Sequence, residues 1–346
     1  MAFLSMYILS VMRDKRTGII PFLVKGILYP LSWIYSFCAC AVDRSYSKGD
    51  KTSEKVNVPV ISVGNITLGG TGKTPFAMYL ADHFLSRGFS PSILIRGYGN
   101  DEDRMLRDEL DGVRVLSGRD RVKNACLAVN RGADVIILDD AFQHRKINRD
   151  MNILMLDASY PFGNGHIFPR GILREPISAI SRADIIVLTK INRIDEYARE
   201  VLVKKLKTIA DGKLIVTMKH SALSLKDVTG SVYSPNEIAV KKVCLVSGIA
   251  DPDYFSFLVK EQGANISARY DFPDHYAYGQ RDIDTINRKC KQQNIEAIIT
   301  TAKDYVKIKE LDISDIEDRL FIMNIGVDIV SGKESLNARL NSFNHS

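Results

Sequence analysis

The side chains with the clearest chemistry lie in a glycine-rich stretch, GNITLGGTGKT, over Gly64–Thr74. An apolar run over Pro59–Val63 precedes it, and a helical pattern over Pro75–Arg87 follows it. Strand, glycine-rich turn and helix in this order are typical of a loop that binds the phosphates of a nucleoside triphosphate. Glycine lacks the Cβ atom that would keep backbone N–H groups away from phosphate oxygens. The predicted nucleotide-binding residues are Gly69, Gly70, Thr71, Gly72, Lys73 and Thr74.

Two side chains at the end of this stretch have roles of their own. Lys73 can reach the β- and γ-phosphates, so we predict that it acts in catalysis, and Thr74 offers a hydroxyl ligand to Mg²⁺. Thr67 stands where the usual pattern has its first glycine. The alternative is a chance glycine-rich turn before a helix, and the combination of GKT with a flanking strand and helix argues against it.

A pair of carboxylates follows the apolar run Val135–Leu138. Downstream of a phosphate-binding loop, an apolar strand that ends in aspartate is typical of the Walker B segment, whose carboxylate lies beside the Mg²⁺ of the bound nucleotide. Successive side chains alternate in direction along a strand, so at most one of the two is expected on the metal. The other could cap the loop or bind through water. The predicted metal ligands are Thr74, Asp139 and Asp140.

The segment Val187–Asn192 lies where a guanine-binding loop would be expected. Asn192 replaces the aspartate that would accept hydrogen bonds from two nitrogen donors of guanine, and an amide cannot supply two acceptors there. ATP is therefore the predicted nucleotide. Partitioning ATPases of membranes carry a lysine immediately before the paired glycines, and Leu68 stands at that position, which argues against a partitioning switch.

Composition limits the class of protein. The 346 residues suffice for two domains, and 45% hydrophobic with 25% charged residues is ordinary for a folded soluble protein. The net charge of +6 is a modest basic excess, and no basic run interleaved with aromatic residues indicates a nucleic-acid surface. The 5 cysteines include no C-x-x-C motif, which predicts reduced thiols in a cytosolic compartment.

Apolar strand-like runs alternate with helical patterns from residue 59 onward, which predicts parallel sheets covered on both faces. The predicted fold class is α/β: a P-loop NTPase-type parallel-sheet domain with a second, smaller α/β domain and an N-terminal membrane-associated helix. The rhythm is lost after residue 220, where turn-forming residues gather. The predicted divisions are a membrane-associated helix and connecting segment over 1–57, the P-loop domain over 58–220, a linker over 221–242 and the smaller domain over 243–346.

The apolar stretch Ile19–Val42 contains the single tryptophan, Trp33, and is interrupted by proline and lysine. Three interpretations compete: a cleaved signal peptide, a buried core helix, and a helix seated in a membrane. Tyrosines beside Trp33 and basic residues upstream form an interfacial pattern that favours the membrane. Whether the helix spans the bilayer or lies in one leaflet is left open.

Seven sequence blocks, in order, resemble the tetraacyldisaccharide 4′-kinase family, which phosphorylates the lipid A precursor at the inner membrane. The resemblance covers about the whole chain. The sequence departs from the family at Ala141, Arg170 and Ile172, and at Arg107–Leu110, where GDEP is typical. The blocks are VISVGNITLGGTGKTP (60–75), RGYG (96–99), DDAFQH (139–144), FGNGHIFPRGILREP (162–176), SGIADP (247–252), FPDHYAY (272–278) and TAKD (301–304).

The resemblance implies transfer of the γ-phosphate of ATP to the 4′-hydroxyl of the tetraacyldisaccharide 1-phosphate, with ATP and Mg²⁺ as cofactors. In the family an Asp–His pair activates that hydroxyl, and the matching positions are Asp108 and His275, which we expect on different domains. Guanidinium groups match phosphate oxygens in geometry. The predicted substrate-binding residues are Arg96, Arg119, Arg170 and Arg174.

The predicted partners are the lipid disaccharide and a membrane surface, without nucleic acid, for a monomer at the cytoplasmic face of the bacterial inner membrane. The alternative function is a membrane-associated P-loop ATPase switch that acts through protein partners. Phosphate transfer to an acceptor lipid distinguishes the two. Gln143, His144 and Glu175 could line the site, and no role is assigned to them.

Overall fold

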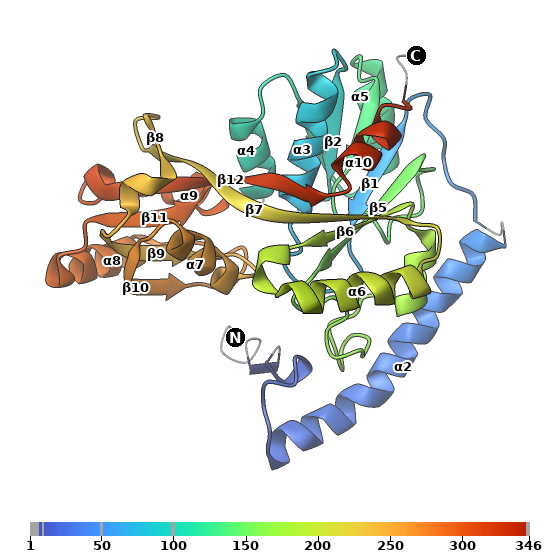
Figure 1. Ribbon diagram of the computed structural model, residues 1–346, viewed down its shortest axis with the longest axis horizontal. Helices are drawn as coiled ribbons and strands as arrows, with labels where there is room; N and C mark the ends of the chain where they lie inside the picture. The colour runs from blue at the N-terminus through green and yellow to red at the C-terminus, as the bar shows by residue number, and fades with distance from the viewer. Residues whose placement is uncertain (1–6, 9, 49–50, 98–100, 344–346) are drawn as a thin grey trace. The chain divides into compact units, whose positions relative to one another are not determined.

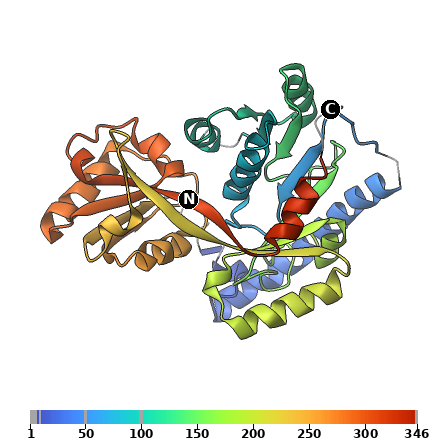
Figure 2. The same ribbon diagram turned by 45° about the horizontal axis from the view of Figure 1, so that its top comes forward.

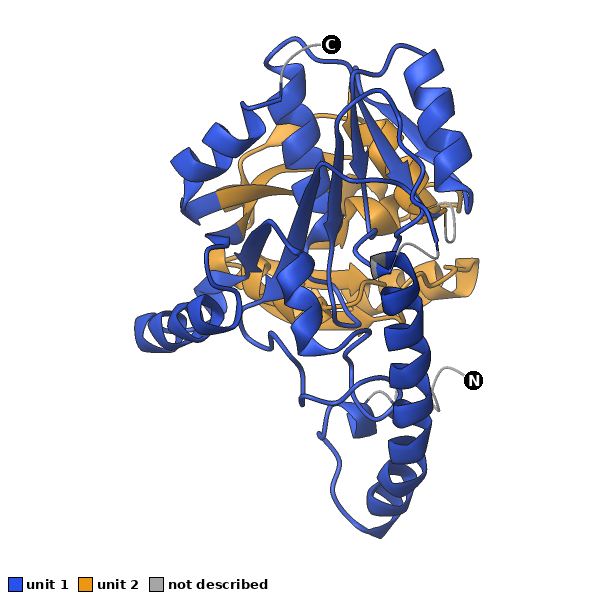
Figure 3. Ribbon diagram, turned by 90° about the vertical axis from the view of Figure 1, so that its right-hand side faces the viewer, with its two compact units in different colours: residues 1–96, 112–219, 329–346 blue, residues 97–111, 220–328 orange. Residues whose placement is uncertain are grey.

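The computed structural model describes residues 7–8, 10–48, 51–97 and 101–343 (Figure 1). The chain forms two compact units. Unit 1 comprises Met1–Arg96, Gly112–Lys219 and Ile329–Ser346, and unit 2 comprises Gly97–Asp111 and His220–Asp328 (Figure 3). The sequence predicted consecutive domains, whereas the observed units are interleaved. The physical reason is that two long strands, β7 (Leu214–Asp227) and β12 (Leu320–Ser331), each contribute residues to both units.

The sheet of unit 1 has the strand order β3-β2-β4-β1-β5-β6-β7, with every neighbouring pair parallel. Every residue of its strands β1, β2, β4 and β6 is buried. A parallel sheet covered on both faces requires such continuous apolar strands, so the predicted α/β class is confirmed. The strands not yet defined are β1 (Val60–Gly64), β2 (Pro91–Ile95), β3 (Arg114–Ser117), β4 (Val135–Leu138), β5 (Met151–Asp157) and β6 (Ile185–Thr189).

Helices cover this sheet. Aspartates cap two of them: Asp120 accepts a hydrogen bond from the Lys123 N–H, and Asp195 accepts one from the Ala198 N–H. The last helix, α10, lies beside α3, where the Arg87 guanidinium donates to the Leu340 carbonyl at 3.3 Å (Figures 1 and 2). The helices are α2 (Ile19–Ser47), α3 (Lys73–Leu85), α5 (Arg121–Asn130), α6 (Glu196–Ile209) and α10 (Lys333–Leu340), with the 3₁₀ turns η1 (Ile177–Arg182) and η2 (Ile191–Arg193).

Unit 2 has its own parallel strands in the order β10-β9-β11-β12, followed by β7 and the short antiparallel strand β8. The predicted linker over 221–242 contains the second half of β7, all of β8 and the 3₁₀ turn η3. The other strands are β8 (Val232–Tyr233), β9 (Lys242–Ser247), β10 (Asn265–Asp271) and β11 (Ala297–Thr301). The helices are α4 (Asp101–Glu109), α7 (Pro252–Glu261), α8 (Gln280–Gln293) and α9 (Ala302–Ile308), with the turns η3 (Pro235–Ile238) and η4 (Glu317–Arg319).

The helix α2 continues through Pro30 and leaves its apolar side chains exposed. Trp33 and Phe37 are each 73% exposed, and only 11% of the most apolar window of the helix is buried. This exposure excludes the core-helix interpretation. One point of attachment is Ser32, whose hydroxyl donates to the Ile167 carbonyl at 2.8 Å. Within the described part of the chain, α2 is the one helix long and apolar enough to cross a membrane.

Candidate active site

The loop between β1 and α3 has the geometry predicted for a phosphate-binding turn. Gly72 precedes the first residue of α3 with φ 77°, and Gly69 has φ 125°. Both angles lie in the region that side chains disfavour. Gly64 is needed for a different reason, because a Cβ atom there would lie 2.4 Å from the Phe142 amide nitrogen.

A second segment supports this loop from the side. The Leu68 N–H donates to the Ile172 carbonyl, and the Arg174 N–H donates to the Ile66 carbonyl, both at 2.7 Å. Thr67 forms an antiparallel bridge with the residue between them, Leu173. The departure from the usual glycine at Thr67 is explained, because the bridge keeps this residue extended and no positive φ is required.

The two carboxylates after β4 have different partners. The Thr74 hydroxyl donates to Asp139 Oδ2 at 2.8 Å, so the hydroxyl and carboxylate that could bind Mg²⁺ are adjacent. Asp140, at φ 47°, instead lies 3.5 Å from Lys73 Nζ and accepts a hydrogen bond from Arg174 at 3.0 Å. Burial alone would raise the pKa of Asp140, but the charges of Lys73 and Arg174 hold it below its ordinary value. Asp140 therefore orients two cations.

The oxygen ligands present fit Mg²⁺, which prefers hard oxygen donors and takes several of them from phosphate and water. Thr74 and Asp139 supply a hydroxyl and a carboxylate at one place. Within residues 7–8, 10–48, 51–97 and 101–343, no group of three or more His, Cys, Asp or Glu side chains is placed to hold a metal. A nucleotide-bound Mg²⁺ does not need such a group.

One buried arginine at this edge was missed by the sequence analysis. Arg121 is 3% exposed and donates to the backbone carbonyls of Asp139, at 2.5 Å, and Asp140, at 3.2 Å. Arg119, which was predicted instead, is exposed. The sequence did contain a signal. Asp120 marks the start of a helix, and Arg121 in the first turn is unfavourable with the helix dipole unless its charge has another partner.

The other predicted arginines lie in different surroundings. Arg174 contacts Asp140, as described, and Arg96 is exposed at the carboxyl end of β2. Arg170 is 8% exposed and pairs with Asp14 at 3.1 Å, so its guanidinium holds the N-terminal segment in place. Within RGYG, Tyr98 and Gly99 lie outside the described residues.

The DDAFQH block also supports the loop. The Gln143 amide donates to the Asn65 carbonyl at 2.7 Å and to the Glu175 carboxylate at 3.2 Å. Burial and the surrounding positive charges, Arg121 first among them, lower the pKa of His144 to about 4. His144 is therefore neutral at physiological pH.

Unit 2 contains a separate group of chemical side chains. His275 Nδ1 lies 3.0 Å from each carboxylate oxygen of Asp101, which is 2% exposed. The hydrogen bond to Asp101 raises the pKa of His275, although burial and Lys303 oppose the shift. Burial opposes the ionisation of Asp101. The hydrogen bond from His275 and the charge of Lys303 outweigh the effect of burial, so the pKa of Asp101 lies well below its ordinary value. The result is an ionised carboxylate that orients an imidazole.

Lys303 defines which nitrogen of the imidazole is available. Its Nζ lies 3.4 Å from His275 Nε2 and forms ion pairs with Glu102 at 3.1 Å and Asp274 at 3.0 Å. An ammonium group can only donate, so in the neutral imidazole these contacts favour the proton on Nδ1, which donates to Asp101, and the lone pair on Nε2. This tautomer places a lone pair on Nε2, as a general base requires.

The predicted pairing of Asp108 with His275 is wrong. Asp108 is exposed and forms an ion pair with Lys309 at 2.5 Å, and both Asp108 and His275 belong to unit 2. Asp101, seven positions earlier, takes the place beside His275.

Three sequence blocks meet around this pair. The Tyr278 hydroxyl donates to Asp304 Oδ1 at 3.0 Å, which joins FPDHYAY to TAKD. Gly248 of SGIADP faces both, because a Cβ atom there would lie 3.1 Å from each of these side-chain oxygens. The contacts hold the loop in which His275 has φ 59°.

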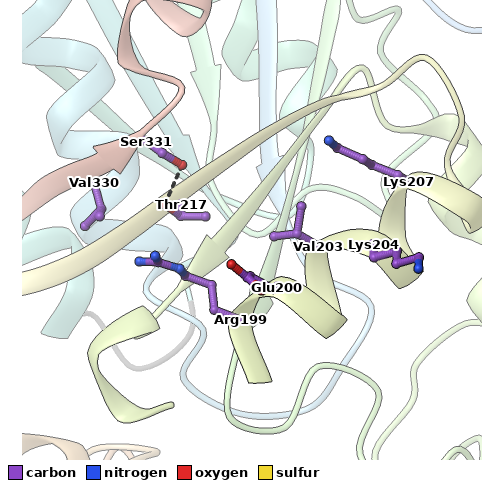
Figure 4. A pocket seen from close by; sticks show the side chains of 8 residues that line it. All are labelled: Arg199, Glu200, Val203, Lys204, Lys207, Thr217, Val330 and Ser331. Atoms are coloured by element: carbon purple, nitrogen blue, oxygen red, sulfur yellow. Dashed lines mark hydrogen bonds between the residues drawn. The ribbon is translucent and has the colours of Figure 1, made fainter. Parts of the chain in front are cut away.

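A surface pocket of about 460 Å³ lies elsewhere in unit 1, between α6 and the ends of β7 and β12 (Figure 4). Thr217 and Ser331 share a hydrogen bond of 2.8 Å at its wall. None of the predicted site residues lines it.

Comparison with known proteins identifies the family of the chain. A family model described as "Tetraacyldisaccharide-1-P 4'-kinase" matches residues 24–109 and 100–344. The chain is 34% identical to the tetraacyldisaccharide 4'-kinase of Desulfatibacillum aliphaticivorans, over 91% of this chain and 90% of the relative. It is also 34% identical to that of Anaeromyxobacter sp. (strain Fw109-5), over 86% of each chain. A crystal structure of LpxK from Aquifex aeolicus in complex with ATP has 29% identity and a TM-score of 0.71, over 92% of this chain and 98% of that chain.

Proposed function

The chain belongs to the tetraacyldisaccharide 4′-kinase family, and from this we propose that it transfers the γ-phosphoryl group of ATP to the 4′-hydroxyl of a tetraacyldisaccharide 1-phosphate, a lipid A precursor. The resemblance to a structure in complex with ATP supports the nucleotide. The observation that carries the proposal is the Asp101–His275 pair, in which a buried carboxylate contacts the imidazole, since a protein that only hydrolyses ATP as a switch has no sugar hydroxyl to deprotonate.

The residues of unit 1 hold the donor. Backbone N–H groups of the loop and Lys73 bind the β- and γ-phosphates. Thr74 and Asp139 would hold Mg²⁺, which neutralises phosphate charge when it is bound. Asp140 keeps Lys73 and Arg174 at the phosphate side of the loop through its ion pairs. Lys73 stabilises the negative charge that develops on the transferred group.

The residues of unit 2 prepare the acceptor. His275 Nε2 accepts the proton of the 4′-hydroxyl as its oxygen attacks the γ-phosphorus, and ADP leaves. Asp101 accepts the Nδ1–H hydrogen bond and stabilises the imidazolium that forms. Lys303, at 3.4 Å from Nε2, is placed to orient the hydroxyl oxygen once the substrate is bound. One chain supplies all of these groups, so the active form in this proposal is a monomer.

The helix α2 brings this chemistry to a lipid. Phe22, Trp33 and Phe37 are each 73% exposed, and covering such side chains with hydrocarbon is favourable by roughly 25 cal/mol per Å² of apolar surface. Arg16, just before the helix, is exposed and suits anionic headgroups. We place the enzyme at the cytoplasmic face of the inner membrane, where ATP and the acyl chains of the substrate meet.

The test is transfer of label from [γ-³²P]ATP to an extracted tetraacyldisaccharide 1-phosphate in detergent. Labelled lipid should accumulate with ADP in equal amounts, and the acceptor should accelerate ATP turnover. ATP hydrolysis that proceeds without labelled lipid, and that a protein partner stimulates, would support the ATPase switch instead.

A further inference from the structure

The segment before α2 folds back onto the phosphate-binding loop of unit 1. A Cβ atom at Gly69 would lie 3.7 Å from Arg13 Nη2, so the guanidinium of Arg13 lies over a glycine of that loop. The family model begins at residue 24, and none of the sequence blocks described above includes Arg13. Arg13 therefore lies outside the residues that the family model matches.

The backbone on both sides of Arg13 is held in place. The Asn164 amide donates to the Met12 carbonyl at 2.8 Å and to the Asp14 carboxylate at 2.7 Å. Asp14, at φ 57°, also pairs with Lys25 at 2.6 Å and with Arg170 at 3.1 Å. Burial opposes the ionisation of Asp14, yet the hydrogen bonds from Lys25, Asn164 and Arg170 lower its pKa to about 2. Asp14 is therefore ionised at physiological pH, and the contacts of Asp14 and Asn164 hold the backbone on both sides of Arg13.

The guanidinium itself lacks part of its hydrogen bonding. Arg13 Nε is buried and has no hydrogen-bond partner among the described residues. Its sequence neighbour Asp14 is already engaged by Lys25 and Arg170. A buried donor without a partner is costly, so such groups in native proteins usually serve a ligand, an ion or a water. Beside a phosphate-binding loop, the ligand that matches a guanidinium is a phosphate.

We propose that Arg13 is a nucleotide-binding residue whose guanidinium contacts the terminal phosphates of ATP. It supplies the extra cation that partitioning ATPases take from a lysine at the position of Leu68. A cation there stabilises the charge on the γ-phosphoryl group during transfer, as arginine residues do in other P-loop enzymes. This inference rests on the proposed function for its chemistry, and it adds a residue to that function.

The experiment compares Arg13→Ala and Arg13→Lys with Lys15→Ala, an exposed lysine of the same segment. Binding of MgATP and MgADP is measured by calorimetry on full-length protein in detergent, without lipid. Arg13→Ala should weaken ATP binding by about 10- to 100-fold and ADP binding less, because a hydrogen bond to a charged group is lost. Arg13→Lys should lie between, and Lys15→Ala should stay within about twofold of the parent.

A rescue measurement separates contact with phosphate from a structural role. Guanidinium ion in the millimolar range should restore part of the lipid phosphorylation lost in Arg13→Ala and should leave Lys15→Ala unchanged. Equal ATP affinity in Arg13→Ala and Lys15→Ala overturns the inference. It is also overturned if Arg13→Ala and Arg13→Lys lose the same binding affinity and lose it equally for ATP and ADP. If Arg13→Ala does not fold, Arg13→Lys and Arg13→Gln decide by the same ATP and ADP comparison.

Failure of the proposed function has a different signature. If the parent protein and Lys15→Ala transfer no label to lipid, the assignment of the acceptor is wrong, whereas the ATP-binding loss in Arg13→Ala still supports the inference. If the parent, Arg13→Ala and Lys15→Ala phosphorylate lipid with the same kcat/KM for ATP, only the inference about Arg13 is wrong.

Discussion

The phosphate-binding loop of unit 1 and the Asp101–His275 pair of unit 2 reach their geometry by different routes. Thr74 and Asp139 are 65 positions apart, but they follow adjacent parallel strands, β1 and β4, whose carboxyl ends share one edge of the sheet. Asp101 and His275 are 174 positions apart, on a helix and a loop that no strand order relates. General rules of sheet topology therefore predict the first contact and are silent about the second.

A large effect should come from Lys73. Lys73→Ala removes the charge that stabilises the transferred phosphoryl group, so kcat should fall by about 10²–10³-fold or more while the fold is retained. The measurement is initial-rate transfer of ³²P to lipid, with Lys123→Ala, an exposed lysine of α5, as the control. Near-normal turnover in folded Lys73→Ala would contradict the role of the loop.

The pair of unit 2 should behave as one catalytic group. Asp101→Ala and His275→Ala should each lower kcat by about 10²–10⁴-fold with little change in ATP affinity. The double variant should be hardly worse than the poorer single variant, because the two residues act together. Asp108→Ala is the matched control, since it removes an exposed carboxylate of the same helix that pairs with Lys309.

That experiment also tests the comparison directly. Losses that multiply in the double variant would show that Asp101 and His275 act independently. A large loss in Asp108→Ala would return the catalytic aspartate to the position predicted from the sequence.

The metal site should separate the two aspartates of unit 1. Asp139→Asn should raise the Mg²⁺ concentration for half-maximal activity by about 10- to 100-fold, because an amide is a poor ligand for Mg²⁺. Asp140→Asn should change kcat more than the Mg²⁺ requirement, since Asp140 contacts Lys73 and Arg174. Identical Mg²⁺ titrations for parent and Asp139→Asn would be evidence against the Walker B assignment.

The pH profile should sharpen the role of His275. A general base must be unprotonated, so kcat/KM should fall as the pH drops through the pKa of His275, which the hydrogen bond to Asp101 raises above its ordinary value. Asp101→Asn removes that charge, so the acid limb should move to lower pH, where the residual activity is measured. An acid limb that stays in place would mean that another group controls it.

The smallest effect on chemistry should come from α2, which belongs to neither catalytic group. Trp33 is the sole tryptophan and is 73% exposed, so its emission reports on this helix without labelling. Anionic vesicles should shift the emission to the blue, and lipid-borne quenchers should reduce it. Emission that vesicles leave unchanged would argue that α2 binds another protein surface.

Several features of the fold and site were predictable because they depend on neighbouring residues. The glycines of the loop and the apolar strands β1 and β4 can be recognised from short segments of sequence. Together they predicted that Thr74 and a carboxylate after β4 lie at one metal site, and Thr74 does contact Asp139. Arg121 was not among the predicted site residues, and the pairing of Arg170 with Asp14 was not predicted. Their roles depend on burial at 3% and 8% and on partners in other segments, which residue type alone does not reveal.

By itself, the sequence determined the α/β class, the nucleotide, the family and the presence of an apolar N-terminal helix, since strand periodicity and glycine backbone angles are properties of short segments. Only the tertiary structure decided that Asp101 and not Asp108 pairs with His275, and that Arg13 lies over Gly69. It also decided that the two units interleave. The physical reason is that a contact between distant residues is selected by packing, by desolvation and by competition among charges, and none of these is written in the spacing of a motif.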